Sequence, residues 1–234
     1  MTNLIPFPRL PALFRLHTRS LGLLALVLAS NLFTYLYSAK VSDPRKENRL
    51  YLMELASKYV YSPEMFEKKV RSVSRQLHIA PEWLMAVMHS ESGFDGSSHN
   101  RQGSGATGLI QFMPATAKTL NITTEKLRNM NHQQQLEYVG HYLQEKRQKY
   151  GDFESLTDVY LAILYPVALQ EEYCYTMYAD PSVAYKQNKG LDQDKDGKVT
   201  VQDIDQYLKH RYPTAYMASK PSPTLFEKIW TDEH

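Results

Sequence analysis

The sequence predicts a mainly α protein, and three observations support this prediction. Apolar residues recur at helical spacing along most of the chain beyond residue 40, as in the series Phe66, Val70, Val73 and Leu77. Prolines stand where helices are expected to begin, at the first helical position that tolerates them. No stretch alternates apolar and polar residues well enough to indicate a sheet, and no internal repeat is present.

The individual helices follow from these patterns. We expect helices over residues 48–60, 63–77, 81–92, a short one from about 114, then 133–150, 156–178 and 201–212. Ser62 offers a capping hydroxyl before Pro63. Residues 93–108 are polar and glycine-rich without an apolar period, so they are expected to form a loop. Pro166 falls inside the expected helix 156–178 and should kink it.

Composition excludes several classes of protein. The chain has 234 residues, 43% of them hydrophobic, which is enough for a packed core and rules out global disorder. Lys and Arg number 27 against 25 Asp and Glu, and three of the arginines lie within residues 1–39. The remainder is close to neutral, so no nucleic-acid-binding surface is expected. The single cysteine, Cys174, excludes an intramolecular disulfide and a Cys-rich zinc site.

The N-terminal segment has the pattern of an export signal. Arg9, Arg15 and Arg19 precede an apolar run over residues 21–39, and the segment has no polar face. Small or branched residues at 27–29 suit a signal peptidase, which would give a cleaved signal peptide. Alternatively, residues 21–39 just reach the roughly 20 needed to cross a bilayer and would form an anchor in the inner membrane. No cysteine follows the run, which excludes a lipoprotein anchor.

One carboxylate lies on an apolar helix face. Leu84, Val87, Met88 and Glu91 occupy positions i, i+3, i+4 and i+7 of the helix that begins at Pro81. A carboxyl in that position is partly desolvated, which raises its pKa and keeps it a proton donor near neutral pH. A glycosidic bond needs such a general acid. The alternative is a glutamate at a helix end that simply reaches solvent.

Two ordered motifs favour the catalytic interpretation. The segment around Glu91 reads A-V-M-H-S-E-S-G-F, and after a polar loop the sequence G-A-T-G-L-I-Q-F-M-P-A-T-A begins at Gly105. Together they closely resemble the SLT-type lytic transglycosylases of the lysozyme-like superfamily, which cleave the glycan strands of peptidoglycan. The resemblance covers roughly residues 73–179. It implies a lysozyme-like helical domain with peptidoglycan as the partner and no cofactor for catalysis.

The resemblance also implies roles for particular residues. Glu91 matches the single catalytic acid and base of the family, and Ser92 would hydrogen-bond it and orient it. Gly108, Gln111 and Met113 match the segment that lines the sugar-binding groove, where glycine lets the backbone approach the glycan. On spacing alone, Met113 fits a core methionine before a proline equally well.

The third family motif, usually A-Y-N-A-G, is altered in this chain. The corresponding residues read L-A-I-L-Y-P-V-A-L, in which Tyr165 aligns with the motif tyrosine and Pro166 replaces the asparagine. This resembles the variant of phage-type members of the family. The hydroxyl of Tyr165 would then contact the catalytic carboxyl.

The chemistry that the resemblance implies needs only one carboxylate. The C6 hydroxyl of N-acetylmuramic acid (MurNAc) attacks C1 and forms a 1,6-anhydro ring, with Glu91 first as acid and then as base. Asp95 could be a second carboxylate, as in a lysozyme-type muramidase, or a solvated aspartate of the loop. A third possibility, suggested by the altered motif, is a non-catalytic peptidoglycan-binding or scaffold protein.

A second site is predicted downstream. Residues 192–203 follow the calcium-loop pattern of the EF-hand, with oxygen ligands at positions 1, 3, 5, 7, 9 and 12 and glycine at position 6. The expected ligands are Asp192, Asp194, Asp196, Lys198, Thr200 and Asp203. Aspartate at position 12 replaces the usual bidentate glutamate, so weak calcium binding or magnesium binding is expected, with a structural role.

These features predict an exported protein of the periplasm or cell envelope. The expected organisation is a signal peptide or anchor (1–39), a helical lead-in (40–72), the lysozyme-like transglycosylase domain (73–180), the calcium-loop region (181–212) and a C-terminal tail (213–234). If the first segment stays uncleaved, the inner membrane is a second partner.

Overall fold

The computed structural model describes residues 49–100 and 103–217. The chain divides into two units, Met1–Arg49 and Leu50–His234, and all of the described residues except Arg49 belong to the second unit. The expected signal peptide or anchor and most of the C-terminal tail lie outside the described residues. Among the helices that the structure describes, none combines the length and the hydropathy that a membrane span requires.

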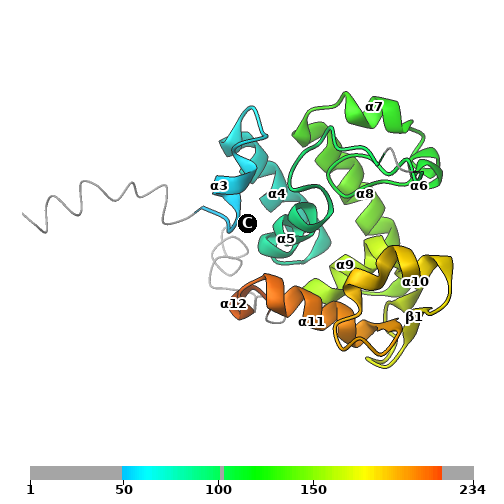
Figure 1. Cartoon of the computed structure of the whole chain (residues 1–234). Helices are drawn as coiled ribbons and strands as arrows, with labels where there is room; N and C mark the ends of the chain where they lie inside the picture. Colours follow the sequence, from blue (N-terminus) through cyan, green and yellow to red (C-terminus); the bar gives the residue numbers. More distant parts are fainter. Residues whose placement is uncertain (1–48, 101–102, 218–234) are drawn as a thin grey trace, which may run out of the picture. The chain divides into compact units, whose positions relative to one another are not determined.

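The described part is mainly helical, which confirms the predicted fold class (Figure 1). The α-helices are α3 (Met53–Ala56), α4 (Pro63–Leu77), α5 (Pro81–Ser92), α6 (Pro114–Thr119), α7 (Thr124–Arg128), α8 (His132–Tyr150), α9 (Leu156–Leu164), α10 (Val183–Asn188), α11 (Val201–Arg211) and α12 (Thr214–Met217). Two 3₁₀ turns are η1 (Pro166–Ala168) and η2 (Lys189–Leu191). Two strands, β1 (Thr176–Ala179) and β2 (Lys198–Thr200), form an antiparallel pair.

Helix α5 lies at the centre of the packing. Its residues 83–88 are all buried, whereas an ordinary amphipathic helix buries only one face. Helices α4 and α9 pack against α5, and α8 packs against α4 (Figure 1). Side chains from Leu50 to Tyr212 join one hydrophobic core. The expected boundary between residues 72 and 73 therefore falls inside α4, within this core.

The prediction of a continuous helix over 156–178 is wrong. Helix α9 ends at Leu164, and Tyr165 adopts φ −154°. Pro166 disfavours a helical conformation in the residue before it, so the chain leaves the helix instead of kinking. Residues 176–179 form strand β1, which pairs with β2 from the predicted calcium loop. Because each strand has at most four residues, no alternating pattern long enough to predict the sheet exists.

The helix expected over 48–60 is also shorter than predicted. Only α3 forms. Leu52 at its N-terminal boundary has the left-handed φ of 67°, and after Ala56 the backbone N–H groups of Lys58 and Tyr59 bond three residues back, as in tighter turns. Helices α4, α5, α8 and α11 begin and end close to the predicted positions, and α6 begins at Pro114 as expected. Ser62 precedes α4 in an extended conformation, but its hydroxyl makes no capping hydrogen bond.

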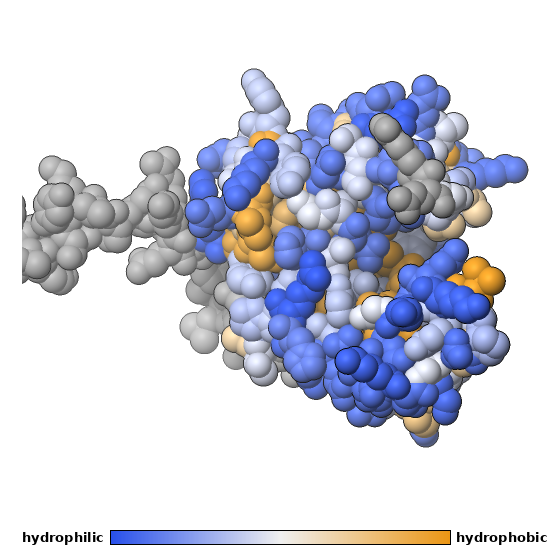
Figure 2. All heavy atoms as spheres, in the orientation of Figure 1, coloured by the Kyte–Doolittle hydropathy of each residue, from blue (hydrophilic) through white to orange (hydrophobic). Residues whose placement is uncertain are grey.

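The surface is mostly hydrophilic on the face that Figure 2 shows, with an apolar patch over α3. The exposed apolar side chains include Leu55 of α3, Met65 at the start of α4, and Met113 before α6. Met113 is thus part of the surface and not of the core.

Candidate active site

Glu91 lies in the last turn of α5. The helix ends there because Gly93 takes the left-handed φ of 60° and donates its backbone N–H to the carbonyl of His89 (3.0 Å). The side chains before Glu91 on the same face, Leu84 and Met88, are fully buried. Glu91 itself is half-buried, so its carboxyl is held at the boundary between the core and the surface.

Burial dominates the electrostatics of this carboxyl. Desolvation raises the pKa of Glu91 from 4.5 to about 7, although a hydrogen bond from Tyr160 acts in the opposite direction. The group is therefore protonated in a large fraction of molecules at neutral pH. It can donate a proton and can take one back after ionising.

The tyrosine that reaches Glu91 is Tyr160, not the Tyr165 that the third motif suggests. Tyr160 lies on the inner face of α9 and is buried, with its hydroxyl as hydrogen-bond partner of the Glu91 carboxyl. The ring of Tyr165 instead packs edge-on against Tyr178 of β1, with 5.4 Å between centroids, and its hydroxyl lies beside Tyr175. The break in the helix before Pro166 places Tyr165 beyond the end of α9.

The hydroxyl of Ser92 is engaged elsewhere than at Glu91. It points to the carbonyl of Met88 one turn earlier (3.1 Å) and to that of Leu109 (2.9 Å). Serine in a helix often donates to the carbonyl four residues before it, and adjacent residues point about 100° apart. Ser92 thus joins the end of α5 to the loop of the second motif, residues 105–113 (the motif loop), instead of orienting Glu91.

Gln135 of α8 holds the motif loop in place. Its side chain is completely buried. Its Oε1 accepts the backbone N–H of Leu109 (2.9 Å), and its Nε2 donates to the carbonyls of Gly96 (2.7 Å) and Leu127 (2.8 Å). One side chain thereby satisfies three buried backbone groups from three segments. No motif in the sequence pointed to this residue.

Gly108 is required by both its conformation and its surroundings. It has φ +85°, and a Cβ at this position would lie 2.6 Å from Oε1 of Gln135. The missing side chain therefore leaves room for the buried Gln135, so the structure gives Gly108 a packing role instead of an opening toward a glycan.

Gln111 and Met113 follow in the same loop. Gln111 has the left-handed φ of 52°, and its Nε2 donates to the carbonyl of Gly108 (3.0 Å). Within residues 49–100 and 103–217, its amide oxygen has no hydrogen-bond donor. Met113 is 46% exposed, which excludes the alternative of a core methionine. Both residues thus present groups that a sugar could contact.

Asp95 closes a turn of its own loop. Its Oδ1 accepts the backbone N–H of Ser97 (2.9 Å) and the Ser97 hydroxyl (2.7 Å). This is the ordinary arrangement of an Asx turn, so the structure gives Asp95 a local role in the loop.

Polar groups of α11 and of Tyr212, which directly follows it, approach the same end of α5. The hydroxyl of Tyr207 lies 3.3 Å from Oγ of Ser90, and Nδ1 of His89 lies 3.1 Å from the hydroxyl of Tyr212. Burial, followed by the charge of Arg211, lowers the pKa of His89. Sequence reasoning missed these contacts, because residues separated by more than 110 positions meet here only through packing.

The predicted calcium loop brings three of its expected ligands together. Carboxylate oxygens of Asp192, Asp194 and Asp196 lie within 4.8 Å of one another. Asp192 accepts the hydroxyl of Tyr185 (2.7 Å) and two backbone N–H groups. Burial acts to raise the pKa of Asp192, but these hydrogen bonds outweigh it and lower the pKa, so the carboxylate is ionised. Ionised oxygens of this kind are the ligands that Ca²⁺ and Mg²⁺ prefer.

Asp203 is arranged differently from the other acidic residues. It is buried at the start of α11, where Oδ1 accepts the N–H of Gln193 (2.9 Å) and Oδ2 accepts the N–H of Thr200 (2.9 Å). Thr200 and Asp203 form a reciprocal capping box. Lys198, at position 7, begins strand β2. The structure thus uses Asp203 to cap α11 and ties that helix to the loop.

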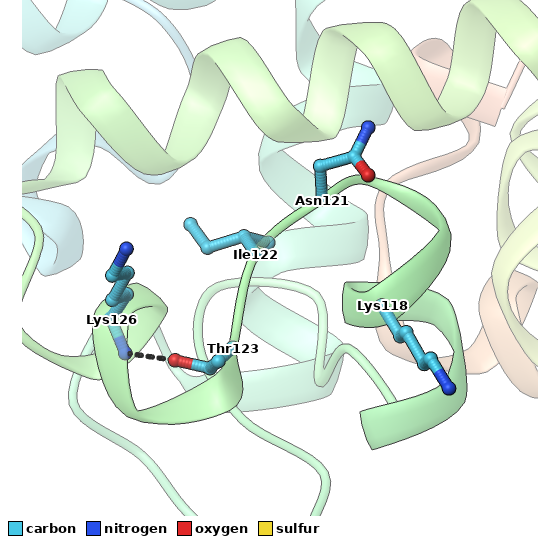
Figure 3. A pocket seen from close by; sticks show the side chains of 5 residues that line it. All are labelled: Lys118, Asn121, Ile122, Thr123 and Lys126. Carbon is cyan, nitrogen blue, oxygen red and sulfur yellow. Dashed lines mark hydrogen bonds between the residues drawn. The ribbon is translucent and has the colours of Figure 1, made fainter.

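A separate open pocket of about 300 Å³ lies between α6 and α7. Figure 3 shows its lining, with Lys118 and Lys126 on either side of the segment that joins the two helices. The Thr123 hydroxyl accepts the backbone N–H of Lys126 (3.1 Å) as the cap of α7. None of the residues around Glu91 lines this pocket.

Comparison with known protein families is consistent with this site. The family model of the transglycosylase SLT domain matches residues 69–196, which is more than half of the chain. The matched region contains Glu91, the motif loop, Gln135 and Tyr160. It ends inside the acidic loop, so α11 lies beyond it.

The fold and the site therefore define a helical, lysozyme-like glycan-cleaving domain. The chain belongs to the transglycosylase SLT domain family, whose members are lytic transglycosylases acting on peptidoglycan. It is an enzyme of this type, with the glycan strands of peptidoglycan as its substrate.

Proposed function

We propose that this enzyme cleaves the β-1,4 bond between MurNAc and N-acetylglucosamine and forms a 1,6-anhydroMurNAc end, with Glu91 as the single general acid and base. The observation that carries the proposal is the half-buried Glu91 carboxyl, whose pKa is raised to about 7 at the end of α5. This is the carboxyl best suited to protonate a leaving glycosidic oxygen near neutral pH.

The reaction proceeds in two proton transfers through the same carboxyl. Protonated Glu91 donates to the oxygen that links the two sugars as the bond to C1 breaks. The C6 hydroxyl of the same MurNAc then attacks C1 and gives its proton to ionised Glu91, which restores the starting state. The internal nucleophile already has the high effective concentration that orientation confers, so a second carboxylate is not needed.

Gln111 and Met113 are proposed to bind the glycan. The amide oxygen of Gln111 can accept a hydroxyl or amide N–H of a sugar, while its nitrogen is held by Gly108. The exposed thioether of Met113 offers an apolar surface to a sugar ring. Gly108 and Ser92 contribute by keeping the loop in place.

The test is digestion of purified sacculi followed by mass spectrometry of the products. Anhydro products support the proposal, and products one water heavier would identify a lysozyme-type muramidase instead. Glu91→Gln should abolish cleavage and leave binding to sacculi intact. If the wild-type protein binds sacculi without cleaving them under any condition, a scaffold function replaces the catalytic one.

We further propose that Asp192, Asp194 and Asp196 bind a structural divalent cation, Ca²⁺ or Mg²⁺. The proposal is supported by the closeness of the three carboxylates and by Gly197 at position 6, whose φ of +87° suits the turn of an EF-hand loop. The ion would stiffen the connection between β1, β2 and α11 and takes no part in the catalytic steps.

The place of action is proposed to be the periplasm or cell envelope. Peptidoglycan lies outside the inner membrane, and residues 1–39 have the pattern of an export signal or a membrane anchor. The mass of the mature protein distinguishes a cleaved signal peptide from an anchor, because only signal cleavage removes the segment. An anchored protein is also found in the membrane fraction. An intact protein in the soluble cytoplasmic fraction would contradict both.

A further inference from the structure

Helix α11 lies outside the matched family region and is fastened to both helices that carry the active site. The hydroxyl of Tyr212, just after α11, donates to the carbonyl of Ala86 in α5 (2.9 Å). Thr157 of α9 donates to a carboxylate oxygen of Asp205 in α11 (3.2 Å). Figure 1 shows α11 beside α9. The helix is therefore held in a fixed position relative to α5, which carries Glu91, and α9, which carries Tyr160.

A chain of polar groups leads from α11 to Glu91. Nη1 of Arg211 donates to the hydroxyl of Tyr207 (3.2 Å), which lies 3.3 Å from Oγ of Ser90. Ser90 is a hydrogen-bond partner of the Tyr160 hydroxyl, and Tyr160 is in turn a partner of Glu91. The rings of Tyr160 and Tyr207 also pack together, with 6.1 Å between centroids.

The groups at the two ends of this hydrogen-bond series determine which group is the donor in each bond. A guanidinium can only donate hydrogen bonds, and an ionised carboxylate can only accept them. Tyr207 therefore accepts from Arg211 and has its own hydrogen to give to Ser90. Ser90, which also hydrogen-bonds Tyr212, can then donate to Tyr160, and Tyr160 can donate to Glu91. Donation in one direction polarises each hydroxyl along the way, which strengthens the last hydrogen bond to the carboxylate.

We propose that α11 is a positioning element of the active site, in which Arg211 and Tyr207 act through Ser90 and Tyr160 to stabilise the ionised form of Glu91. This inference rests on the proposed role of Glu91 as acid and base. The ionised form is the one that takes the C6 hydroxyl proton in the second transfer. Residues outside the family domain thereby tune its catalytic group.

The groups that face this region come from three elements. Glu91, His89 and Ser90 belong to α5, Tyr160 belongs to α9, and the segment from α11 supplies Tyr207, Arg211 and Tyr212. Burial favours neutral Glu91, and the hydroxyl chain acts against it, which is consistent with a pKa near 7 instead of a higher value. Arg211 also contacts the Tyr212 hydroxyl, so its positive charge acts on both Tyr207 and Tyr212.

The direct test is a titration of the Glu91 carboxyl by carbon NMR, with the signal assigned from its absence in Glu91→Gln. In Tyr207→Phe and in Arg211→Met the titration midpoint should rise by about 0.5 to 1 pH unit above that of the wild type. Tyr173→Phe, an exposed tyrosine, is the matched control and should leave the midpoint unchanged. A midpoint in Tyr207→Phe within about 0.2 unit of the wild type would overturn the proposal.

Kinetics on sacculi provide a second readout. Because protonated Glu91 starts the reaction, the alkaline limb of kcat/KM should move upward with the titration midpoint in both variants, while KM changes less than about twofold. Arg211→Lys retains the charge and should restore part of the shift. A fall in activity with an unmoved limb would mean that α11 is only structural, which contradicts the proposal.

Two further features make the outcome interpretable. If Tyr207→Phe does not fold, Ser90→Ala interrupts the same chain at a half-buried position and should raise the midpoint in the same way. The NMR titration needs no enzymatic activity. If Glu91→Gln still cleaves sacculi, the proposed function fails, and the titration nevertheless decides whether α11 acts on Glu91.

Discussion

The side chain of Gln135 accepts a hydrogen bond from the backbone N–H of Leu109 at 2.9 Å, deep in the protein. This contact joins α8 to the loop that carries Gln111 and Met113, while Ser92 joins the same loop to α5 through the carbonyl of Leu109. The peptide groups on both sides of Leu109 are thus fixed. The loop lies against the catalytic helix because of these two contacts, and Gln111 and Met113 depend on its position.

Gln135→Met should destabilise the protein by about 3 kcal/mol, because it keeps the volume but leaves three buried backbone groups without partners. The change is measured by urea unfolding monitored by circular dichroism. Gln148→Met, on an exposed position of α8, is the control and should stay within about 0.5 kcal/mol of the wild type. A similarly small effect of Gln135→Met would mean that the buried amide does not hold the loop.

Gly108→Ala should destabilise the protein by about 2 kcal/mol and reduce cleavage of sacculi, since it adds a Cβ in the left-handed region and places it 2.6 Å from Gln135. Gly190→Ala is a suitable control because a Cβ there meets nothing within 4 Å. Thermal unfolding and activity are measured for both. A Gly108→Ala protein as stable as the Gly190→Ala protein would contradict the assigned packing.

Glu91→Gln should make the protein more stable than the wild type above pH 7. The folded-state pKa of about 7 lies above the unfolded value of 4.5, so the wild type gains stability from Glu91 below pH 4.5 and loses it as pH rises toward 7. The variant lacks this loss, so its free energy of unfolding should exceed that of the wild type by up to about 3 kcal/mol at pH 8. Urea unfolding across this range measures the difference, which should nearly vanish at pH 4.5 and below. An equal difference at all pH values would show that the Glu91 carboxyl is not desolvated.

Tyr160→Phe and Tyr165→Phe should behave differently. Loss of the Tyr160 hydroxyl removes the hydrogen bond that lowers the pKa of Glu91, so the alkaline limb of the pH–rate profile should move upward and kcat should fall about tenfold. Tyr165→Phe should leave the limb in place, because its hydroxyl lies beside Tyr175. The reverse pattern would support the alignment of Tyr165 with the motif tyrosine.

Calcium should raise the thermal unfolding temperature, and chelation should lower it, because the ion binds only the folded loop. The double variant Asp194→Asn with Asp196→Asn should lose this response without losing stability in chelator, since both side chains are exposed. A magnesium titration identifies the preferred ion. An unfolding temperature that is identical with and without millimolar Ca²⁺ and Mg²⁺ would exclude the metal site.

Much of the fold could be predicted from the sequence, because it depends on neighbours in the chain. Pro63, Pro81 and Pro114 begin helices where they were expected to, and Gly151 ends α8. The position of Glu91 on the buried face of α5 follows from helical spacing alone. The error at residues 165–178 has a local cause as well, since Pro166 excluded the helical conformation of the residue before it.

The sequence by itself determined the helices, the family motifs and the carboxylate at the end of α5, because spacing, capping and proline act over a few residues. Only the tertiary structure decided which tyrosine reaches Glu91, that Gln135 fixes the motif loop, and that Tyr207 of α11 lies beside Ser90. These contacts join residues 26 to 117 positions apart. The packing of whole helices brings them together, and no local pattern records which side chains will then meet.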